Sequence, residues 1–199
     1  GEKIKEFETT NEYSFLFGFE ESNGYLAGTY ARDKDAIVAS MLIAEMACYY
    51  QLKEMNLYEA LNVLYTKYGF FEEQCVSITI GGLNGLETMT GIMSSLRQTP
   101  PTAFAGIEIA KVRDYQSGKV VNVENGEEQE TGLPNADVLF YELTDGSSVI
   151  VRPSGTEPKL KLYIMVKADS KPEAANKKEQ LVQDSKSLIG KLSENDICI

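Results

Sequence analysis

A strict two-residue alternation runs through the stretch K-L-K-L-Y-I-M-V from Lys159 to Val166. Leucine, isoleucine and valine occupy every second position, and the positions between them carry lysine, tyrosine or methionine. Successive side chains of a β-strand point to opposite faces of its sheet, so this pattern is typical of a strand with one buried face. The stretch therefore predicts a strand in a sheet that is covered on one side, and it places Lys161 on the other side.

The loop before this strand, R-P-S-G-T-E-P, has the composition of an anion-binding turn. Arg152 supplies a planar guanidinium that can form two hydrogen bonds to phosphate or carboxylate oxygens. Ser154, Gly155 and Thr156 add hydroxyl and backbone N–H groups that can close around an anion as a nest. Lys161, in the strand, is expected to face back towards this loop. A plain hairpin turn that happens to contain an arginine is the alternative interpretation.

The composition excludes several classes of function. With 199 residues, 43% of them hydrophobic, the chain is long enough for one large domain or two small ones. A net charge of −11 disfavours nucleic-acid binding, and no apolar run reaches membrane-spanning length. The three cysteines have no C-x-x-C spacing and are expected to be reduced thiols of a cytoplasmic protein. The chain has no histidine, which excludes Ser–His, Cys–His and histidine-ligated metal chemistry.

The pattern of apolar residues predicts two units, 1–72 and 73–199. In the first, the run Phe15–Phe17 predicts a buried parallel strand, and a buried apolar helix is expected from about residue 36 to residue 50. A capping box of Asn56 and Glu59 is expected to start another helix. The second unit is expected to contain strands at residues 76–80, 107–114, 138–143 and 147–151, the strand after Pro158, and helices at residues 83–97 and from residue 170 onward. The predicted fold class is therefore an α/β unit followed by a small antiparallel sheet with two helices on one side.

A second polar loop, G-F-E-E-S-N-G-Y at residues 18–25, follows the predicted strand Phe15–Phe17. Ligands bind beyond the carboxyl ends of strands in open α/β sheets, so this loop is well placed to hold one. Glu20 and Ser22 can form hydrogen bonds with sugar hydroxyl groups. A general acid–base pair of Glu20 and Glu21 is the alternative, but the side chains of adjacent loop residues diverge.

The segment R-D-K-D, which contains Lys34, precedes the first long helix. Asp33 or Asp35 is expected to cap this helix, and cations near its N-terminus lie where the backbone dipole already favours anions. The D-K-D triplet is also conceivable as a metal loop, but capping charges are the expected role.

Three of these motifs are similar to those of one enzyme family, the α-D-phosphohexomutases, which comprises the phosphoglucomutases and phosphomannomutases. R-P-S-G-T-E-P-K resembles the phosphate-binding loop of the family's last domain, and G-F-E-E-S-N-G resembles the sugar-binding loop G-E-E-S-x-G of its third domain. R-D-K-D resembles the family's R-E-K-D segment, whose lysine helps to hold the substrate. The substrate-binding residues that this resemblance implies are Glu20, Ser22, Lys34, Arg152, Ser154, Gly155, Thr156 and Lys161.

In this family a phosphoserine within a motif like T-A-S-H-N-P transfers the phosphoryl group, and a magnesium ion held by D-G-D-x-D-R assists it. Neither motif occurs here, so the resemblance implies no catalytic and no metal-binding residue in this chain. It implies instead a C-terminal fragment, a truncated third domain followed by the fourth domain, with the N-terminal domains of the same chain as its partners. The parent enzyme is expected to interconvert glucose 1-phosphate and glucose 6-phosphate through a bisphosphate intermediate, with Mg²⁺ and glucose 1,6-bisphosphate as cofactors, and the fragment itself is expected to be inactive. The alternatives are a phosphomannomutase or phosphopentomutase fragment, or a standalone, non-catalytic phosphosugar-binding module.

Overall fold

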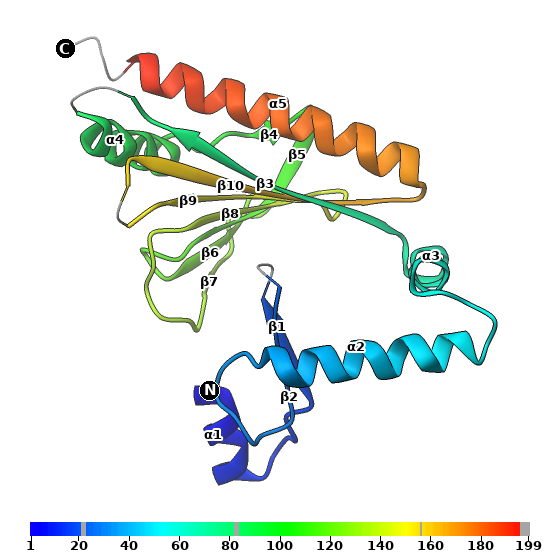
Figure 1. Cartoon of the computed structure of the whole chain (residues 1–199). Coiled ribbons are helices and arrows are strands. Elements are labelled where there is room, and N and C mark those ends of the chain that lie inside the picture. Colours follow the sequence, from blue (N-terminus) through cyan, green and yellow to red (C-terminus); the bar gives the residue numbers. More distant parts are fainter. Residues whose placement is uncertain (21–22, 82–83, 156, 196–199) are drawn as a thin grey trace. The chain divides into compact units, whose positions relative to one another are not determined.

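The computed structural model of the chain describes residues 1–20, 23–81, 84–155 and 157–195. The chain divides into two compact units, unit 1 from Gly1 to Leu64 and unit 2 from Tyr65 onward. Figure 1 shows the elements of both units, coloured along the sequence.

Unit 1 contains helix α1 (Glu2–Thr10), strands β1 (Phe17–Glu20) and β2 (Gly24–Ala27), helix α2 (Ala36–Gln51) and the first part of helix α3 (Leu57–Tyr68). The two strands form an antiparallel hairpin in which Phe17 lies opposite Ala27 and Glu20 lies opposite Gly24. The connection between them therefore falls within the predicted sugar-binding loop.

The prediction of a buried parallel strand at Phe15–Phe17 is wrong. The strand begins at Phe17, and in the described part of unit 1 it pairs only with β2, in the antiparallel direction. Leu16 is 79% exposed and Phe19 is 74% exposed. An apolar run indicates a need for burial, but it does not identify the neighbouring strand or its direction.

The starts of α2 and α3 follow the predicted capping chemistry. The Asp35 carboxylate accepts hydrogen bonds from the backbone N–H groups of Ile37 at 2.8 Å and Val38 at 3.2 Å. Asn56 and Glu59 exchange two side chain–backbone hydrogen bonds, 2.8 and 2.9 Å long, which confirms the predicted capping box.

Helix α2 is strongly apolar, yet none of its residues is buried. Ile37 is 77% exposed, Met41 65% and Ile43 49%. A helix that is hydrophobic on all sides is normally buried in a protein core. The described residues of unit 1 do not supply the cover that the sequence predicts for this helix.

Unit 2 is built on an antiparallel sheet with the strand order β3-β10-β9-β8-β5-β6-β7, and the short β4 pairs with β5 beside it. The strands are β3 (Phe70–Thr79), β4 (Ala103–Phe104), β5 (Ile107–Asp114), β6 (Lys119–Asn122), β7 (Glu128–Glu130), β8 (Leu139–Leu143), β9 (Ser148–Pro153) and β10 (Lys159–Ala168). The sequence predicts the boundary between the units after Glu72. This residue lies inside β3, which starts at Phe70.

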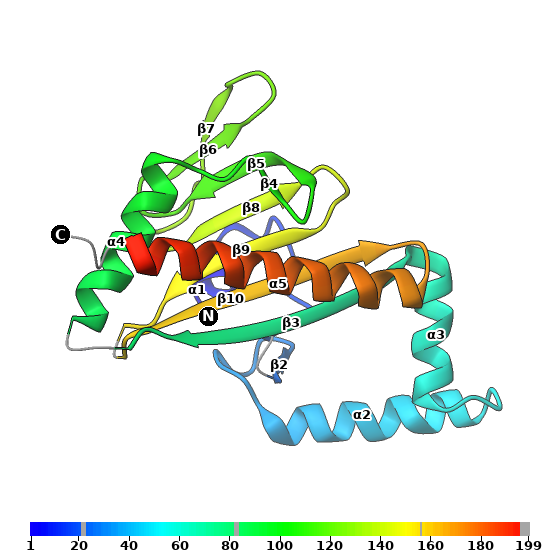
Figure 2. The same cartoon turned by 90° about the horizontal axis from the view of Figure 1, so that it is seen from above.

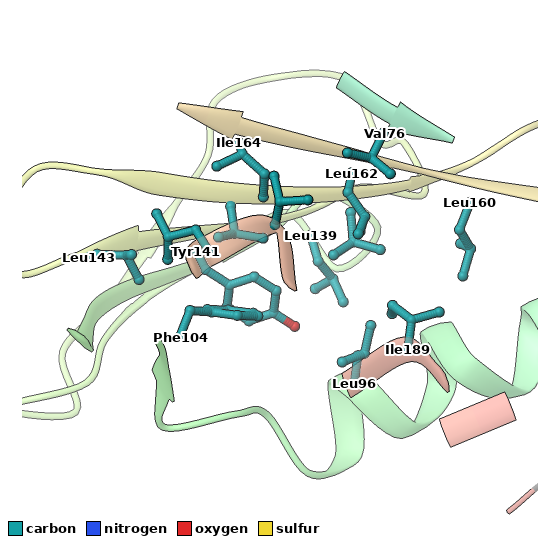
Figure 3. Packing of buried hydrophobic residues seen from close by; sticks show 14 of the residues in the cluster. Val76, Leu96, Phe104, Leu139, Tyr141, Leu143, Leu160, Leu162, Ile164 and Ile189 are labelled. Atoms are coloured by element: carbon teal, nitrogen blue, oxygen red, sulfur yellow. The ribbon is translucent and has the colours of Figure 1, made fainter. Parts of the chain in front are cut away.

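Helices α4 (Gly85–Gln98) and α5 (Lys171–Asn195) lie on the same side of this sheet (Figure 1 and Figure 2). The hydrophobic core lies between these helices and the sheet. Within it the rings of Phe104 and Tyr141 pack with their centroids 5.4 Å apart, near Leu96 of α4 and Ile189 of α5 (Figure 3). An α/β unit followed by an antiparallel sheet with two helices is the fold class that the sequence predicts.

The alternation in β10 is confirmed residue by residue. Leu160, Leu162 and Ile164 are 0% exposed and Val166 is 2% exposed, whereas Lys161 is exposed. The covered face of the sheet therefore holds the core, and the opposite face carries Lys161.

Candidate phosphate-binding site

Arg152 and Lys161 face each other across two paired strands. They are direct register partners in the antiparallel β9–β10 ladder, so their side chains project from the same face of the sheet. Both residues are exposed, and neither forms an ion pair with any described residue. By contrast, nearby Lys159 is paired with Glu157 at 3.0 Å. Like charges directly opposite each other destabilise a sheet, so this pair of cations is suited to an anion that contacts both.

The turn that follows Arg152 carries the remaining predicted phosphate-binding residues. Ser154 and Gly155 lie in this turn, and the Ser154 N–H donates a hydrogen bond of 2.8 Å to the carbonyl oxygen of Lys159. Thr156 lies outside the described residues. The fold thus brings Arg152, Ser154 and Gly155 together at the ends of β9 and β10.

Gly155 has no conformational or steric reason to be glycine in this turn. Its φ lies outside the left-handed region, and, its two chain neighbours aside, an added Cβ would meet no heavy atom of the described residues within 4 Å. The backbone would therefore accept a larger residue. The glycine leaves the surface above the turn open, and close approach of a ligand to the backbone needs this kind of opening.

A cavity of about 570 Å³ lies beside Arg152 and the turn. Its other walls are formed by α4 and by the segment that precedes β8, and the lining residues from these walls are Met89, Thr90, Ala136, Asp137 and Val138. No sequence pattern indicates this lining, because these residues are distant from the loop in the chain and form no motif. A larger cavity of about 750 Å³ is bordered by β3, α4 and α5, and none of the predicted site residues that the structure describes lines it.

We expect Gly155→Ala to weaken phosphate binding without harming the fold. The free energy of unfolding should stay constant or rise by about 0.4–1 kcal/mol, because alanine restricts the unfolded chain at a position where it fits without strain. The dissociation constant for inorganic phosphate should increase, because the new methyl group occupies the open surface over the turn. Gly81→Ala is a matched control, since Gly81 also has open surroundings and a φ outside the left-handed region. Equal phosphate affinities of the two variants and the wild type, measured by calorimetry, would show that the anion does not approach Gly155.

In unit 1, Lys34 and Glu20 form an ion pair in which Nζ and Oε1 are 3.0 Å apart. The Lys34 ammonium also lies 3.0 Å from Oδ1 of Asp33. Hydrogen bonds to Asp33 and then to Glu20 raise the pKa of Lys34, which keeps the ammonium charged. All three side chains are substantially exposed and accessible to a ligand. Ser22, which is predicted to bind the sugar together with Glu20, lies outside the described residues.

Gly24 makes room for Lys34 to reach Glu20. A Cβ added to Gly24 would lie 2.0 Å from Cδ and 2.7 Å from Cγ of Lys34. Gly24 is also the register partner of Glu20 at the end of the β1–β2 hairpin. The aliphatic part of the lysine therefore lies directly against the glycine backbone, and the hairpin brings its ammonium group to the glutamate.

The two aspartates of the D-K-D segment have separate structural partners. Asp33 contacts Lys34, while Asp35 caps α2 and accepts a hydrogen bond from the Tyr30 hydroxyl. This bond and the backbone N–H groups at the start of α2 lower the pKa of the Asp35 carboxyl.

Among the described residues, no three histidine, cysteine, aspartate or glutamate side chains gather where they could hold a metal ion. In the same part of the chain, no helix combines the length and the apolar character needed to cross a membrane.

Two family models match the chain, one over unit 1 and the first residues of unit 2 and the other within unit 2. Residues 2–68 match the model "Phosphoglucomutase/phosphomannomutase, alpha/beta/alpha domain III", and residues 104–183 match "Phosphoglucomutase/phosphomannomutase, C-terminal domain". The first match contains Glu20 and Lys34, and the second contains Arg152 and Lys161.

Staphylococcal phosphoglucomutases are similar in sequence to the chain. The Staphylococcus epidermidis protein is 34% identical over 158 residues, which cover 79% of this chain and 29% of that protein. The Staphylococcus haemolyticus protein is 35% identical over 167 residues, which cover 84% of this chain and 30% of that protein. The chain therefore spans less than a third of the length of these relatives.

A solved structure has the same fold. Parafusin, an exocytosis-sensitive phosphoprotein and phosphoglucomutase from Paramecium, is similar in its open form with a TM-score of 0.62 and 16% sequence identity. The similarity covers 97% of this chain and 32% of the Paramecium chain.

Proposed function

Because the chain belongs to the phosphoglucomutase/phosphomannomutase family, we propose that it is the substrate-binding part of a mutase that interconverts glucose 1-phosphate and glucose 6-phosphate. One observation carries this proposal. Arg152 and Lys161, two exposed cations, are register partners beside an open glycine turn and a cavity. They lie in the segment that matches the family's C-terminal domain.

In this proposal Arg152 and Lys161 bind the phosphate group that stays on the sugar during the reaction. The guanidinium donates two hydrogen bonds to the phosphate oxygens, and the lysine adds a second positive charge. The hydroxyl groups of Ser154 and Thr156 and the N–H groups of Gly155 and Thr156 complete the binding shell. A fixed phosphate at one end of the sugar orients the other end for phosphoryl transfer, which is catalysis by positioning.

Glu20, Ser22 and Lys34 contact the sugar itself. The Glu20 carboxylate accepts hydrogen bonds from sugar hydroxyl groups, and the Ser22 hydroxyl can both donate and accept them. The 3.0 Å ion pair with Lys34 supports this role for Glu20, because it restricts the carboxylate before the sugar arrives. A side chain that is already ordered loses less conformational freedom on binding.

The phosphoryl-transfer chemistry is proposed to come from other domains of a longer polypeptide. The chain covers 29% and 30% of the two staphylococcal relatives, and it has neither the T-A-S-H-N-P nor the D-G-D-x-D-R motif. Mg²⁺ and glucose 1,6-bisphosphate serve the full-length enzyme in this proposal.

Turnover measurements test this function. With Mg²⁺ and glucose 1,6-bisphosphate present, the full-length enzyme should convert glucose 1-phosphate to glucose 6-phosphate faster than it converts mannose 1-phosphate. The 199-residue chain alone should give no turnover under the same conditions. Mutase activity that follows the purified chain through a sizing column would contradict the proposal, as would a full-length protein that turns over neither hexose phosphate. A preference for mannose 1-phosphate would contradict the assignment to glucose.

A further inference from the structure

The cavity beside the phosphate turn contains a carboxylate as well as a guanidinium. Asp137 lines it together with Arg152, Ser154 and Gly155, and its side chain is 44% exposed. A free carboxylate at this position would repel a phosphate ion or would pair with Arg152 in its place. The cavity can accept an anion well only if the charge of Asp137 is neutralised by another group.

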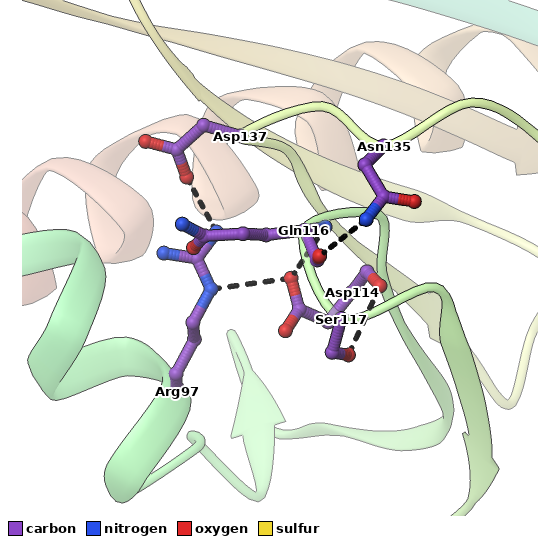
Figure 4. A network of polar contacts seen from close by, with 6 residues as sticks. All are labelled: Arg97, Asp114, Gln116, Ser117, Asn135 and Asp137. Carbon is purple, nitrogen blue, oxygen red and sulfur yellow. Dashed lines mark hydrogen bonds and ion pairs between the residues drawn. The ribbon is translucent and has the colours of Figure 1, made fainter.

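Arg97 supplies this neutralisation from behind the cavity wall. It lies in the last turn of α4, where its Nη2 forms an ion pair with Asp137 and its Nε lies 3.1 Å from Oδ1 of Asp114 (Figure 4). The side chains of Arg97 and Asp114 are 21% and 20% exposed. Burial acts to lower the pKa of Arg97, but the hydrogen bonds to Asp137 and Asp114 together raise it, so the guanidinium stays charged.

The position of Asp137 in the wall does not depend on Arg97 alone. The N–H of Ala136 donates to the carbonyl oxygen of Tyr115 at 3.1 Å, and the N–H of Tyr115 donates to the carbonyl oxygen of Val138 at 3.0 Å. These backbone hydrogen bonds attach the segment on both sides of Asp137 to the end of β5. Shortening the Arg97 side chain should therefore release the carboxylate while the backbone that carries it stays in place.

We propose that Arg97 is a positioning residue for phosphate binding, which holds the Asp137 carboxylate and offsets part of its charge so that Arg152 remains available to the anion. This inference rests on the proposed function of the Arg152 turn, and it extends that function to a residue that lies outside the cavity lining. It assigns a role to the end of α4, a part of the chain in which the sequence shows no motif.

The proposal is tested by measuring the dissociation constant of the 199-residue chain for inorganic phosphate. The variants are Arg97→Ala, Asp137→Asn and the double variant. Arg97→Ala should raise the dissociation constant about fivefold, the effect expected from one partly exposed charge. The double variant should return to within about twofold of the wild type, because Asp137→Asn removes the carboxylate charge that Arg97 otherwise offsets. Asp137→Asn alone should bind phosphate at least as tightly as the wild type.

A purely structural role for Arg97 gives a different pattern. In that case the double variant binds as weakly as Arg97→Ala, because the cavity wall has collapsed. This result, or unchanged binding by Arg97→Ala, overturns the inference, whereas the proposed function stands as long as the wild type binds phosphate and Arg152→Ala does not. A wild-type chain that binds no phosphate overturns both.

Thermal unfolding of every variant reports on the fold independently of phosphate. Arg97→Gln keeps hydrogen-bonding capacity without the charge, and it serves as the second variant if Arg97→Ala fails to fold. It should show the same weakening of phosphate binding and the same rescue by Asp137→Asn. Binding at the wild-type level by Arg97→Gln would overturn the inference.

Discussion

Replacement of Arg152 by alanine is expected to lower kcat/KM of the full-length enzyme by about tenfold to several hundredfold. A hydrogen bond to a charged group contributes about 1.5–3 kcal/mol, and the guanidinium can form two to one phosphate. Arg152→Lys should recover only part of the loss, because a point charge does not replace the two parallel donors. Since Arg152 is exposed, the free energy of unfolding should change by less than about 0.5 kcal/mol.

Lys111→Ala is the control for the general effect of removing a positive charge. Lys111 is an exposed cation on β5 of the same sheet, and it does not belong to the cavity lining. Steady-state kinetics with glucose 1-phosphate should show a large loss in Arg152→Ala and little change in Lys111→Ala. Equal losses in the two variants would mean that net charge, and not this site, governs substrate binding.

Leu162→Ala is expected to destabilise unit 2 by about 2–5 kcal/mol, the usual cost of a cavity in a well-packed core. Leu162 is 0% exposed and lies in β10, which pairs with β3 on one side and with β9 on the other. Hydrogen exchange of the β10 amides is the suitable measurement, because the chain has two units and need not unfold in one transition.

The adjacent variant Lys161→Ala is the matched control, because Lys161 lies on the opposite face of the same strand. In Lys161→Ala, the free energy of opening from hydrogen exchange of the β10 amides should change by less than about 0.5 kcal/mol, while the affinity for phosphate should fall. Leu162→Ala should therefore lower stability, whereas Lys161→Ala should weaken phosphate binding. Destabilisation of similar size in both variants would contradict the assignment of Lys161 to the uncovered face.

The sequence was most informative where a local pattern determines a local structure. The alternation at residues 159–166 predicts the two faces of β10, and the capping box of Asn56 and Glu59 forms as expected. Both features depend on residues within a few positions of one another, and their geometry follows from the strand and helix repeats alone. The expected proximity of Lys161 to the loop also follows, since a hairpin connection places Lys161 opposite Arg152.

Features that depend on distant segments were not predictable from the sequence. The run Phe15–Phe17 indicates burial, but its neighbour in the described part of unit 1 is the antiparallel β2. Helix α2 has the composition of a buried helix, yet the described residues of unit 1 leave it exposed. Met89, Asp137 and the rest of the cavity wall reach the phosphate turn only through the packing of α4 and the strand order of the sheet.

Titration of the 199-residue chain with inorganic phosphate, followed by the amide resonances of Ser154 and Gly155 in NMR spectra, tests the central claim most directly. In the wild type these two resonances should shift and saturate with a dissociation constant on the order of 1 mM, the affinity expected of a single phosphate loop. The Lys111 amide should stay in place, and Arg152→Ala should abolish the shifts. Unmoved Ser154 and Gly155 resonances in the wild type, or equal shifts in Arg152→Ala, would contradict a phosphate site at this turn.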